Sequence, residues 1–185
     1  MRVIAGRAKG TQLQAVPGNL TRPISDRVKE SLFDVLGDAI VDARVLDLFA
    51  GTGSVGIEAL SRGAQSAVFV EKHPRAIETI RANVRRARFQ DCARIVQADV
   101  FKFLKRQPEP FDLIYIAPPQ YRSLWSRTLR ALEATPGWID PAGLVIVQIF
   151  PKELEPLELT TLRLGDRRQY GSTLLCFYES LSHQP

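Results

Sequence analysis

The chain of 185 residues and 20.7 kDa has the length of one ordinary domain, and its 45% of hydrophobic residues is enough for a full core. With 24% charged residues and only 12 glycines and 12 prolines, the composition excludes disordered, collagen-like and low-complexity proteins. No apolar run approaches the roughly 18 residues that a membrane span needs, and residues 1–10 lack the apolar stretch of a secretory signal. We therefore expect a globular protein of the cytoplasm.

Residues that form disulfides or bind metals are scarce. The sequence has only Cys92 and Cys176, with no CxxC pair, and only His73 and His183 as imidazoles. We therefore expect two reduced thiols and no metal site.

The positive charge is concentrated in two segments, although the net charge is only +5. Residues 1–30 carry six basic side chains against two acidic ones, and residues 72–94 carry seven against two. Such surfaces attract polyanions, because each phosphate that Lys or Arg neutralises releases counterions. A solvated helix face explains residues 72–94 equally well. The first segment supplies our candidates for phosphate contacts, namely Arg2, Arg7, Lys9, Arg22, Arg27 and Lys29.

The first predicted elements are a basic hairpin and a helix. Residues 2–5 and 12–16 read as two short strands joined by a turn that contains Gly and Lys. Ser25 is a good N-cap, and the apolar residues that follow recur with a 3.6-residue period until Gly37. These features predict a helix that begins after Ser25 and stops at Gly37.

From residue 44 onward, strands and helices alternate. The predicted strands cover residues 44–49, 66–71, 93–97, 111–116 and 143–149, and the predicted helices cover residues 54–62, 74–88, 99–106 and 121–134. Apolar strands that are each followed by a helix imply a parallel sheet covered on both faces. Residues 157–164 and 170–178 then predict a closing strand pair, with Gly165 and Asp166 in the turn region. The fold class is therefore α/β.

A glycine-rich loop, GTGSVG at residues 51–56, lies between the first of these strands and its helix. Glycines allow close backbone approach to a ligand, the helix N-terminus offers unpaired N–H groups, and open α/β sheets bind ligands at this position. With Glu71 as a ribose acceptor, the loop matches the dinucleotide fingerprint. A nicotinamide-dependent oxidoreductase and a purely structural turn are therefore both open alternatives.

Acidic residues near three strand ends favour S-adenosylmethionine over a dinucleotide. Asp47, four residues before Gly51, would repel a pyrophosphate but suits the sulfonium and ammonium groups of S-adenosylmethionine. Glu71 is placed to accept both ribose hydroxyls, and Asp99 to accept the adenine amino group, although Asp99 is also a good N-cap. The predicted cofactor-binding residues are Asp47, Phe49, Gly51, Thr52, Gly53, Glu71, Lys72, Asp99 and Val100.

The fourth parallel strand ends in IAPPQY at residues 116–121. Two prolines fix a turn whose carbonyls no continuing ladder can use, so we expect these carbonyls to face a cleft. The segment resembles the Asp/Asn-Pro-Pro-Tyr/Phe motif of class I amino-methyltransferases. More closely, the chain resembles the RsmD family, which methylates N2 of guanine 966 in 16S ribosomal RNA. That resemblance rests on MRVIAG at 1–6, TRP at 21–23, DRVKE at 26–30, DLFAGTG at 47–53 and FVE at 69–71.

The resemblance implies a Rossmann-like class I methyltransferase fold, with a seven-stranded, mostly parallel sheet, helices on both faces and a small N-terminal hairpin and helix extension. It further implies transfer of methyl from S-adenosylmethionine to guanine N2 in 16S ribosomal RNA or the assembling small subunit, by a monomer. We expect one domain, comprising a basic extension over residues 1–41, a catalytic core over 42–180 and a tail over 181–185. Arg22 or Arg27 could reach the cofactor carboxylate instead of RNA.

One departure from the family pattern concerns Ala117, which stands where Asp or Asn is usual. The proposed catalytic residues are Ala117, Pro118, Pro119 and Tyr121, with Gln120 as a substrate contact. The aromatic ring of Tyr121 could stack on an extruded base or instead belong to the core, whereas Trp125 is expected to pack against the sheet. Because Ala117 lacks an acceptor side chain, a protein that binds ribosomal RNA without methylating it is an alternative. So is methylation of a DNA amine.

Overall fold

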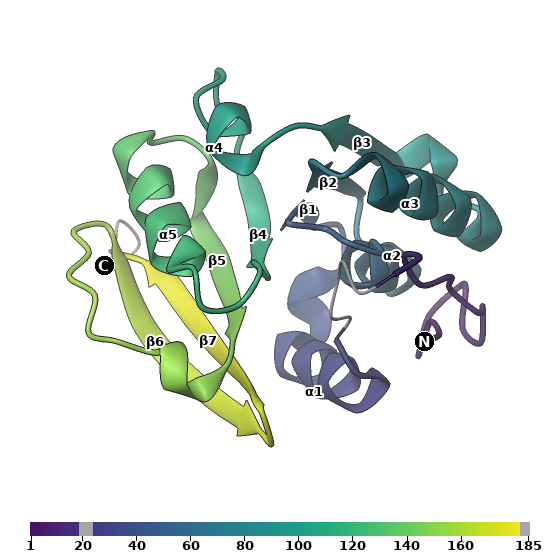
Figure 1. Cartoon of the computed structure of the whole chain (residues 1–185), viewed down its shortest axis with the longest axis horizontal. Coiled ribbons are helices and arrows are strands. Elements are labelled where there is room, and N and C mark those ends of the chain that lie inside the picture. Colours follow the sequence, from purple (N-terminus) through teal and green to yellow (C-terminus); the bar gives the residue numbers. More distant parts are fainter. Residues whose placement is uncertain (19–23, 182–185) are drawn as a thin grey trace.

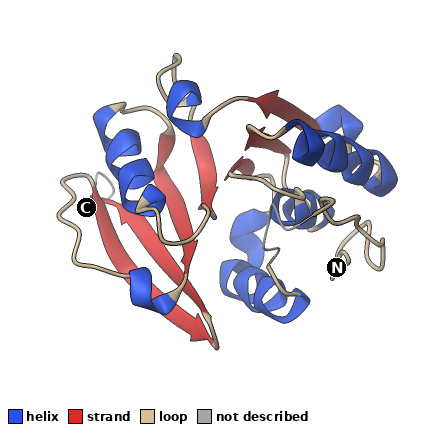
Figure 2. Ribbon diagram, in the orientation of Figure 1, coloured by secondary structure: helices blue, strands red, loops and turns tan. Residues whose placement is uncertain are grey.

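A seven-stranded sheet with helices on both faces forms the centre of the molecule (Figures 1 and 2). This computed structural model describes residues 1–18 and 24–181. The strands are β1 (Arg44–Leu48), β2 (Ser66–Glu71), β3 (Ala93–Gln97), β4 (Phe111–Ile116), β5 (Ile139–Ile149), β6 (Leu162–Tyr170) and β7 (Thr173–Ser180). The helices are α1 (Asp26–Leu36), α2 (Ser54–Ser61), α3 (Pro74–Ala87), α4 (Val100–Phe103) and α5 (Leu124–Ala134), with 3-10 turns η1 (Gly37–Ile40), η2 (Gln90–Cys92) and η3 (Pro151–Glu153).

The strand order is β3-β2-β1-β4-β5-β7-β6, and the expected α/β fold is confirmed. Strands β1 to β5 pair in parallel, whereas β7 runs antiparallel to both β5 and β6. The order reverses between β1 and β4, where Asp47 is paired in register with Tyr115. Ligands of open α/β sheets bind beyond the carboxyl ends of the strands at such a reversal.

Apolar side chains fill both faces of the sheet. On one face, α1, α2 and α3 cover residues such as Val45, Phe69 and Ile146, and on the other face α4 and α5 cover residues such as Leu46 and Val147 (Figure 1). Trp125 is buried in the second of these layers, as predicted. None of the described helices is long and apolar enough to cross a membrane.

Two of the predicted helices begin later or end earlier than expected. Helix α5 begins at Leu124 rather than residue 121, because Tyr121 and Ser123 adopt positive φ angles of 57° and 49°, which a right-handed helix does not accept. Helix α4 ends at Phe103 and is a single turn capped by Asp99. By contrast, α1 agrees with prediction, since the Ser25 hydroxyl accepts the Val28 N–H and Gly37 ends the helix with a positive φ.

The closing hairpin is displaced from its predicted position. Its turn lies at residues 171–172, and Gly165 lies inside β6, where the pairing with β7 shifts by one residue. A Cβ on Gly165 would lie 2.8 Å from a Glu179 carboxylate oxygen, so the glycine allows this bulge. The prediction was wrong because nearly all of β6 is exposed and its sequence therefore lacks the alternation of a half-buried strand.

The N-terminal residues form an arm (residues 1–18) on helices α2 and α3 instead of a ladder of two strands. The predicted hairpin is reduced to one bridge between Arg2 and Gln12. Many backbone groups that a ladder would use are taken by helix side chains. For example, Glu58 accepts the Ile4 and Ala5 N–H groups at 2.8 and 3.0 Å, and Asn83 exchanges two hydrogen bonds with Gln14.

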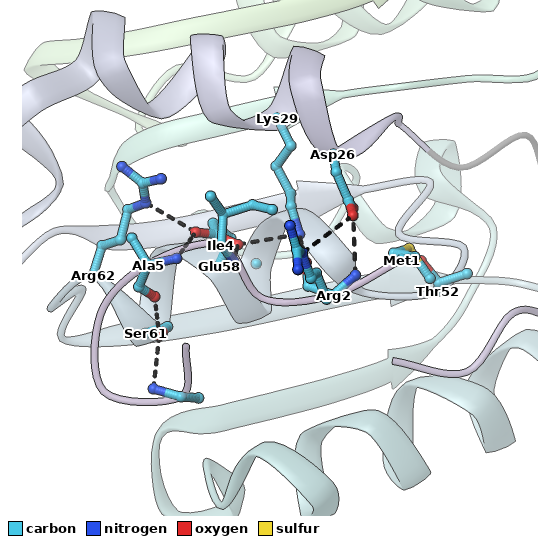
Figure 3. Close-up of polar contacts among 12 residues, drawn as sticks. Met1, Arg2, Ile4, Ala5, Asp26, Lys29, Thr52, Glu58, Ser61 and Arg62 are labelled. Atoms are coloured by element: carbon cyan, nitrogen blue, oxygen red, sulfur yellow. Dashed lines mark hydrogen bonds and ion pairs between the residues drawn. The ribbon is translucent and has the colours of Figure 1, made fainter. Parts of the chain in front are cut away.

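A buried charge cluster holds this arm against α2 (Figure 3). The Glu58 carboxylate, 0% exposed, lies 3.1 Å from the Lys29 ammonium and 2.9 Å from Arg62 Nε. Lys29, also 0% exposed, donates at 2.6 Å to the Arg2 carbonyl. Glu58 thus receives four donors, two from side chains and two from the arm, which makes its burial tolerable.

We predict that Glu58→Ala lowers the free energy of unfolding by roughly 3–5 kcal/mol, because it leaves the buried Lys29 ammonium without a counter-ion and two arm N–H groups without an acceptor. Urea denaturation measures this change. Glu78→Ala, on the exposed face of α3, is the matched control and should change stability by less than about 0.5 kcal/mol. Equal midpoints for the two variants would show that the cluster does not stabilise the fold.

Candidate active site

A cavity of about 290 Å³ opens at the carboxyl ends of the five parallel strands, β1 to β5. Its volume lies near the lower end of the range for small-molecule sites. Residues from four loops that are far apart in the sequence meet in it. The predicted site residues that line it are Asp47, Phe49, Gly51, Thr52, Glu71, Lys72, Asp99, Val100, Ala117, Pro118, Pro119 and Gln120.

Three residues in and next to the glycine loop after β1 have a left-handed backbone conformation. Phe49, Gly51 and Gly53 have φ angles of 61°, 57° and 75°, and Gly53 caps α2. Gly53 is not among the residues that line the cavity, and a Cβ at this position would lie 3.3 Å from both Phe69 and Ile80 in the core. Gly56 is tighter still, with a Cβ position 2.4 Å from the Phe69 ring. These two glycines serve helix and strand packing, and Gly51 borders the cavity.

The Glu71 carboxylate fixes the loops at the ends of β1 and β2. Its Oε2 accepts the Gly51 N–H at 3.0 Å, and its Oε1 accepts the N–H groups of Lys72 and His73 at 2.7 and 2.9 Å. Each carboxylate oxygen offers about two acceptor positions, so Oε1 is filled and Oε2 keeps one. In this arrangement Glu71 can accept one further hydroxyl, rather than the two that we expected.

Asp47 lies at the floor of the cavity and is 2% exposed. Its Oδ2 accepts the Gly56 N–H at 3.2 Å. Burial raises the pKa of this carboxyl from 3.8 to about 8; the Gly56 hydrogen bond opposes the rise, and the nearby Glu71 charge adds to it. A buried carboxyl of this kind favours a cationic ligand, which would stabilise its ionised form.

Asp99 caps a helix, one of the two roles that its position suggested, and it also lies where a ligand could reach it. Its Oδ1 accepts the Phe101 and Lys102 N–H groups at 3.0 and 3.2 Å, so it caps α4. It also lines the cavity together with Val100. Its second oxygen makes no hydrogen bond within the described chain and is therefore free to accept one from a ligand.

The proline turn after β4 borders the other side of the cavity. Ala117, Pro118, Pro119 and Gln120 all line it, and no N–H of the described residues donates to the Pro118 carbonyl. Tyr121 does not line the cavity. Its ring is 66% exposed and lies 5.8 Å from the Phe150 ring, so it is not a core residue. The turn therefore offers backbone acceptors, with an exposed aromatic residue next to Gln120.

The basic residues that we predicted to contact phosphates differ in their exposure. Lys29 cannot reach a phosphate, because it is fully buried against Glu58, so this prediction was wrong. Arg7, Lys9 and Arg27 are exposed, and the Arg7 guanidinium lies 5.3 Å from the centre of the Phe89 ring. None of these side chains lines the cavity. Arg2 is exposed near Asp26, and Arg22 lies outside the described residues.

Several cavity residues escaped prediction. The Tyr115 hydroxyl, buried between Asp47 and β5, donates a hydrogen bond to Gln148 Oε1, and both residues line the cavity. Burial raises the pKa of Tyr115 well above its usual value. Gln148 is the one polar residue in an apolar stretch of β5, a signal that could have identified it. Thr173, from the distant β7, gave no such signal.

No group of three or more His, Cys, Asp or Glu side chains within residues 1–18 and 24–181 is arranged to hold a metal ion.

Comparison with known proteins gives concordant matches. The sequence profile of the family described as Conserved hypothetical protein 95 matches residues 1–179. YlbH of Bacillus subtilis, provisionally named an rRNA methyltransferase, is 34% identical over 183 residues, which cover 97% of this chain and 98% of YlbH. Ribosomal RNA small subunit methyltransferase D of Escherichia coli is 34% identical over 148 residues, covering 80% of this chain and 74% of that protein. The solved structure of yhhF from Escherichia coli, provisionally named a methyltransferase, superposes with a TM-score of 0.88 at 31% identity and covers 99% of both chains.

The raised pKa of Asp47 predicts a specific pH dependence of stability. The folded state binds the proton of Asp47 more tightly than the unfolded state does. Protonation of Asp47 therefore contributes fully to the free energy of unfolding below about pH 3.8, and this contribution is lost as the pH rises through about 8. One such group adds a slope of at most about 1.4 kcal/mol per pH unit. Asp47→Asn keeps an acceptor for the Gly56 N–H but cannot ionise.

The free energy of unfolding, measured by urea denaturation between pH 5 and 8, should therefore fall more steeply with pH in the parent protein than in Asp47→Asn. Identical slopes would mean that Asp47 is already ionised in the folded protein at neutral pH.

Proposed function

Because the chain belongs to the Conserved hypothetical protein 95 family, which is the RsmD family, we propose that it transfers a methyl group from S-adenosylmethionine to N2 of a guanine in 16S ribosomal RNA. The position known for the RsmD family, guanine 966, is the proposed target. The observation that carries the proposal is a single cavity with two kinds of lining. Asp47, Glu71 and Asp99, at the carboxyl ends of β1, β2 and β3, line one part, and the proline turn after β4 lines another.

The residues around the cavity fit S-adenosylmethionine. Asp47 suits a cationic amino acid end, Glu71 Oε2 can accept one ribose hydroxyl, and Asp99 Oδ2 can accept an adenine N–H. A dinucleotide pyrophosphate would be repelled by three acids, against which the described lining sets one basic side chain that is always charged, Lys72, and this balance counts against the oxidoreductase alternative. When bound, S-adenosylmethionine supplies an electrophilic methyl group.

The proline turn is suited to holding an exocyclic amine. Guanine N2 shares its lone pair with the ring, so acceptors that hold its N–H groups help the nitrogen become pyramidal towards the methyl group. The Pro118 carbonyl is available for one N–H, and the Gln120 side chain borders the same space. No metal or covalent nucleophile is required in this direct displacement.

Ala117 leaves the proline turn with fewer acceptors for the guanine amine, but not with none. A side-chain acceptor at this position would add a charge-assisted hydrogen bond worth roughly 1.5–3 kcal/mol, or about 10- to 150-fold in rate. The chain can therefore be a slow enzyme. The same residue favours one alternative function, a protein that binds ribosomal RNA and does not methylate it.

Exposed basic residues outside the cavity are proposed to contact the phosphates of the RNA. Arg2, Arg7 and Lys9 lie on the arm, and Arg27 lies on α1. Arg86 of α3 donates to the Gln12 carbonyl at 3.2 Å, so the basic face of α3 adjoins the arm. Exposed basic residues on adjoining segments suit a folded RNA rather than a small metabolite.

The proposal is tested by incubating the purified protein with methyl-labelled S-adenosylmethionine and 16S ribosomal RNA, free or in small subunits, from cells that lack the protein. Nuclease digestion and mass spectrometry should find one labelled N2-methylguanosine. Retained RNA binding without label would favour the binding protein, and label on a DNA adenine or cytosine would favour a DNA methyltransferase.

Restoring an acceptor at the proline turn should accelerate the reaction. Ala117→Asn is expected to raise kcat by about 10-fold, since it adds a hydrogen bond that the amine makes in the transition state. Single-turnover methylation measures the change, and Ala142→Asn, at an exposed position of β5, is the control. Unchanged turnover in Ala117→Asn would mean that the side chain at 117 does not face the amine.

Removal of the exposed ring should separate RNA recognition from cofactor binding. Tyr121→Ala is expected to lower kcat/KM for RNA by about 5- to 150-fold, the range that corresponds to one base stacked on an aromatic ring. The Kd for S-adenosylhomocysteine should stay within about twofold, because Tyr121 does not line the cavity. Equal losses in both quantities would place Tyr121 in the scaffold.

A further inference from the structure

The Glu153 carboxylate joins two loops that are about 30 residues apart in the sequence. Its Oε1 accepts the Tyr121 N–H at 2.7 Å, and its Oε2 accepts the Phe150 N–H at 3.1 Å. Tyr121 follows the proline turn after β4, and Phe150 follows β5. One side chain therefore fixes the backbone of both loops at the rim of the cavity.

A local role explains only one of these two bonds. Glu153 is the last residue of η3, and a glutamate at this position commonly accepts the N–H of the residue before its turn, which here is Phe150. The bond to Tyr121 adds nothing to η3, because Tyr121 belongs to a different loop. That second bond is the observation that needs a function.

The bond from the Tyr121 N–H to Glu153 holds a residue with an unusual backbone conformation. The residue has a φ of 57°, a left-handed conformation that a tyrosine adopts only when its surroundings hold it there. Its ring lies 5.8 Å from the Phe150 ring at an angle of 49°. Tyr121 is 66% exposed, whereas Phe150 is half-buried. The backbone bonds thus present the Tyr121 ring to the outside of the protein, with the Phe150 ring beside it.

The aromatic pair lies next to residues that line the cavity. Gln120 immediately precedes Tyr121, and Ile149 immediately precedes Phe150, and both line the cavity wall. A base that enters the cavity from solution would pass this rim. Aromatic rings at such a place stack on unpaired bases of any sequence.

We propose that Glu153 is a positioning residue, which holds the Tyr121 ring, beside the Phe150 ring, in place to stack on the base that is to be methylated. This inference rests on the proposed function and extends it to a residue outside the cavity. Glu153 does not touch substrate or cofactor. It acts by keeping the end of the proline turn and the aromatic pair in one arrangement before RNA arrives.

A double-mutant cycle tests the inference, because a residue that acts through Tyr121 loses its effect once Tyr121 is gone. The four proteins are the parent, Glu153→Ala, Tyr121→Ala and the double variant, with Glu155→Ala as the matched control two residues away in an exposed position. The quantities measured are kcat/KM for methylation of 16S ribosomal RNA and the Kd for S-adenosylhomocysteine.

Glu153→Ala is expected to lower kcat/KM for RNA by roughly 10- to 100-fold, the loss that follows from a misplaced substrate-positioning group. The Kd for S-adenosylhomocysteine should stay within about twofold, and Glu155→Ala should behave as the parent. In the Tyr121→Ala background, adding Glu153→Ala should change kcat/KM by less than about threefold. Glu153→Gln keeps one side-chain oxygen and should recover part of the activity.

Two results would overturn the inference while the proposed function stands. One is a Glu153→Ala variant as active as Glu155→Ala, and the other is an undiminished further loss in the Tyr121→Ala background. A simple folding defect is recognised by a weakened Kd for S-adenosylhomocysteine and also counts against the inference. A parent protein that methylates no RNA would overturn the proposed function and this inference together.

Discussion

Carboxylates that accept backbone N–H groups at the strand ends are the interaction on which the site depends. Glu71 binds the glycine loop and the start of the next connection with three such bonds, and Asp47 holds the first turn of α2 through Gly56. These bonds hold loop conformations that include left-handed residues. The acids also keep some acceptor capacity for a ligand.

Buried or half-buried glutamates also fix the N-terminal arm and the loops after β4 and β5. Glu58 binds two N–H groups of the N-terminal arm, and Glu153 binds one N–H from each of two rim loops. Asn83 adds a link between the arm and the glycine loop, since its amide donates to the carbonyls of Gln14 and Thr52 at 3.0 Å each. Side chains on regular elements therefore determine where the irregular segments lie.

The fold could be predicted because its strands and helices carry strong local patterns, and the lining of the cavity because ligands of parallel sheets bind at known strand ends. One prediction failed because the decisive contact is distant in the sequence. Lys29 was expected on the surface, but the structure buries it against Glu58. Likewise, no local pattern shows that Phe69 and Ile80 lie beside Gly53. The exposed β6 gave no alternation to fix its turn. No pattern in the sequence pairs Glu153 with Tyr121.

The central claim is that the acids around the cavity select an adenosyl cofactor with a cationic end over a dinucleotide. Calorimetric titration of the purified protein with S-adenosylhomocysteine and with NAD, in parallel and in one buffer, tests that claim most directly. The account predicts saturable binding of S-adenosylhomocysteine with one site per chain and no heat of binding for NAD. Binding of NAD alone would contradict it.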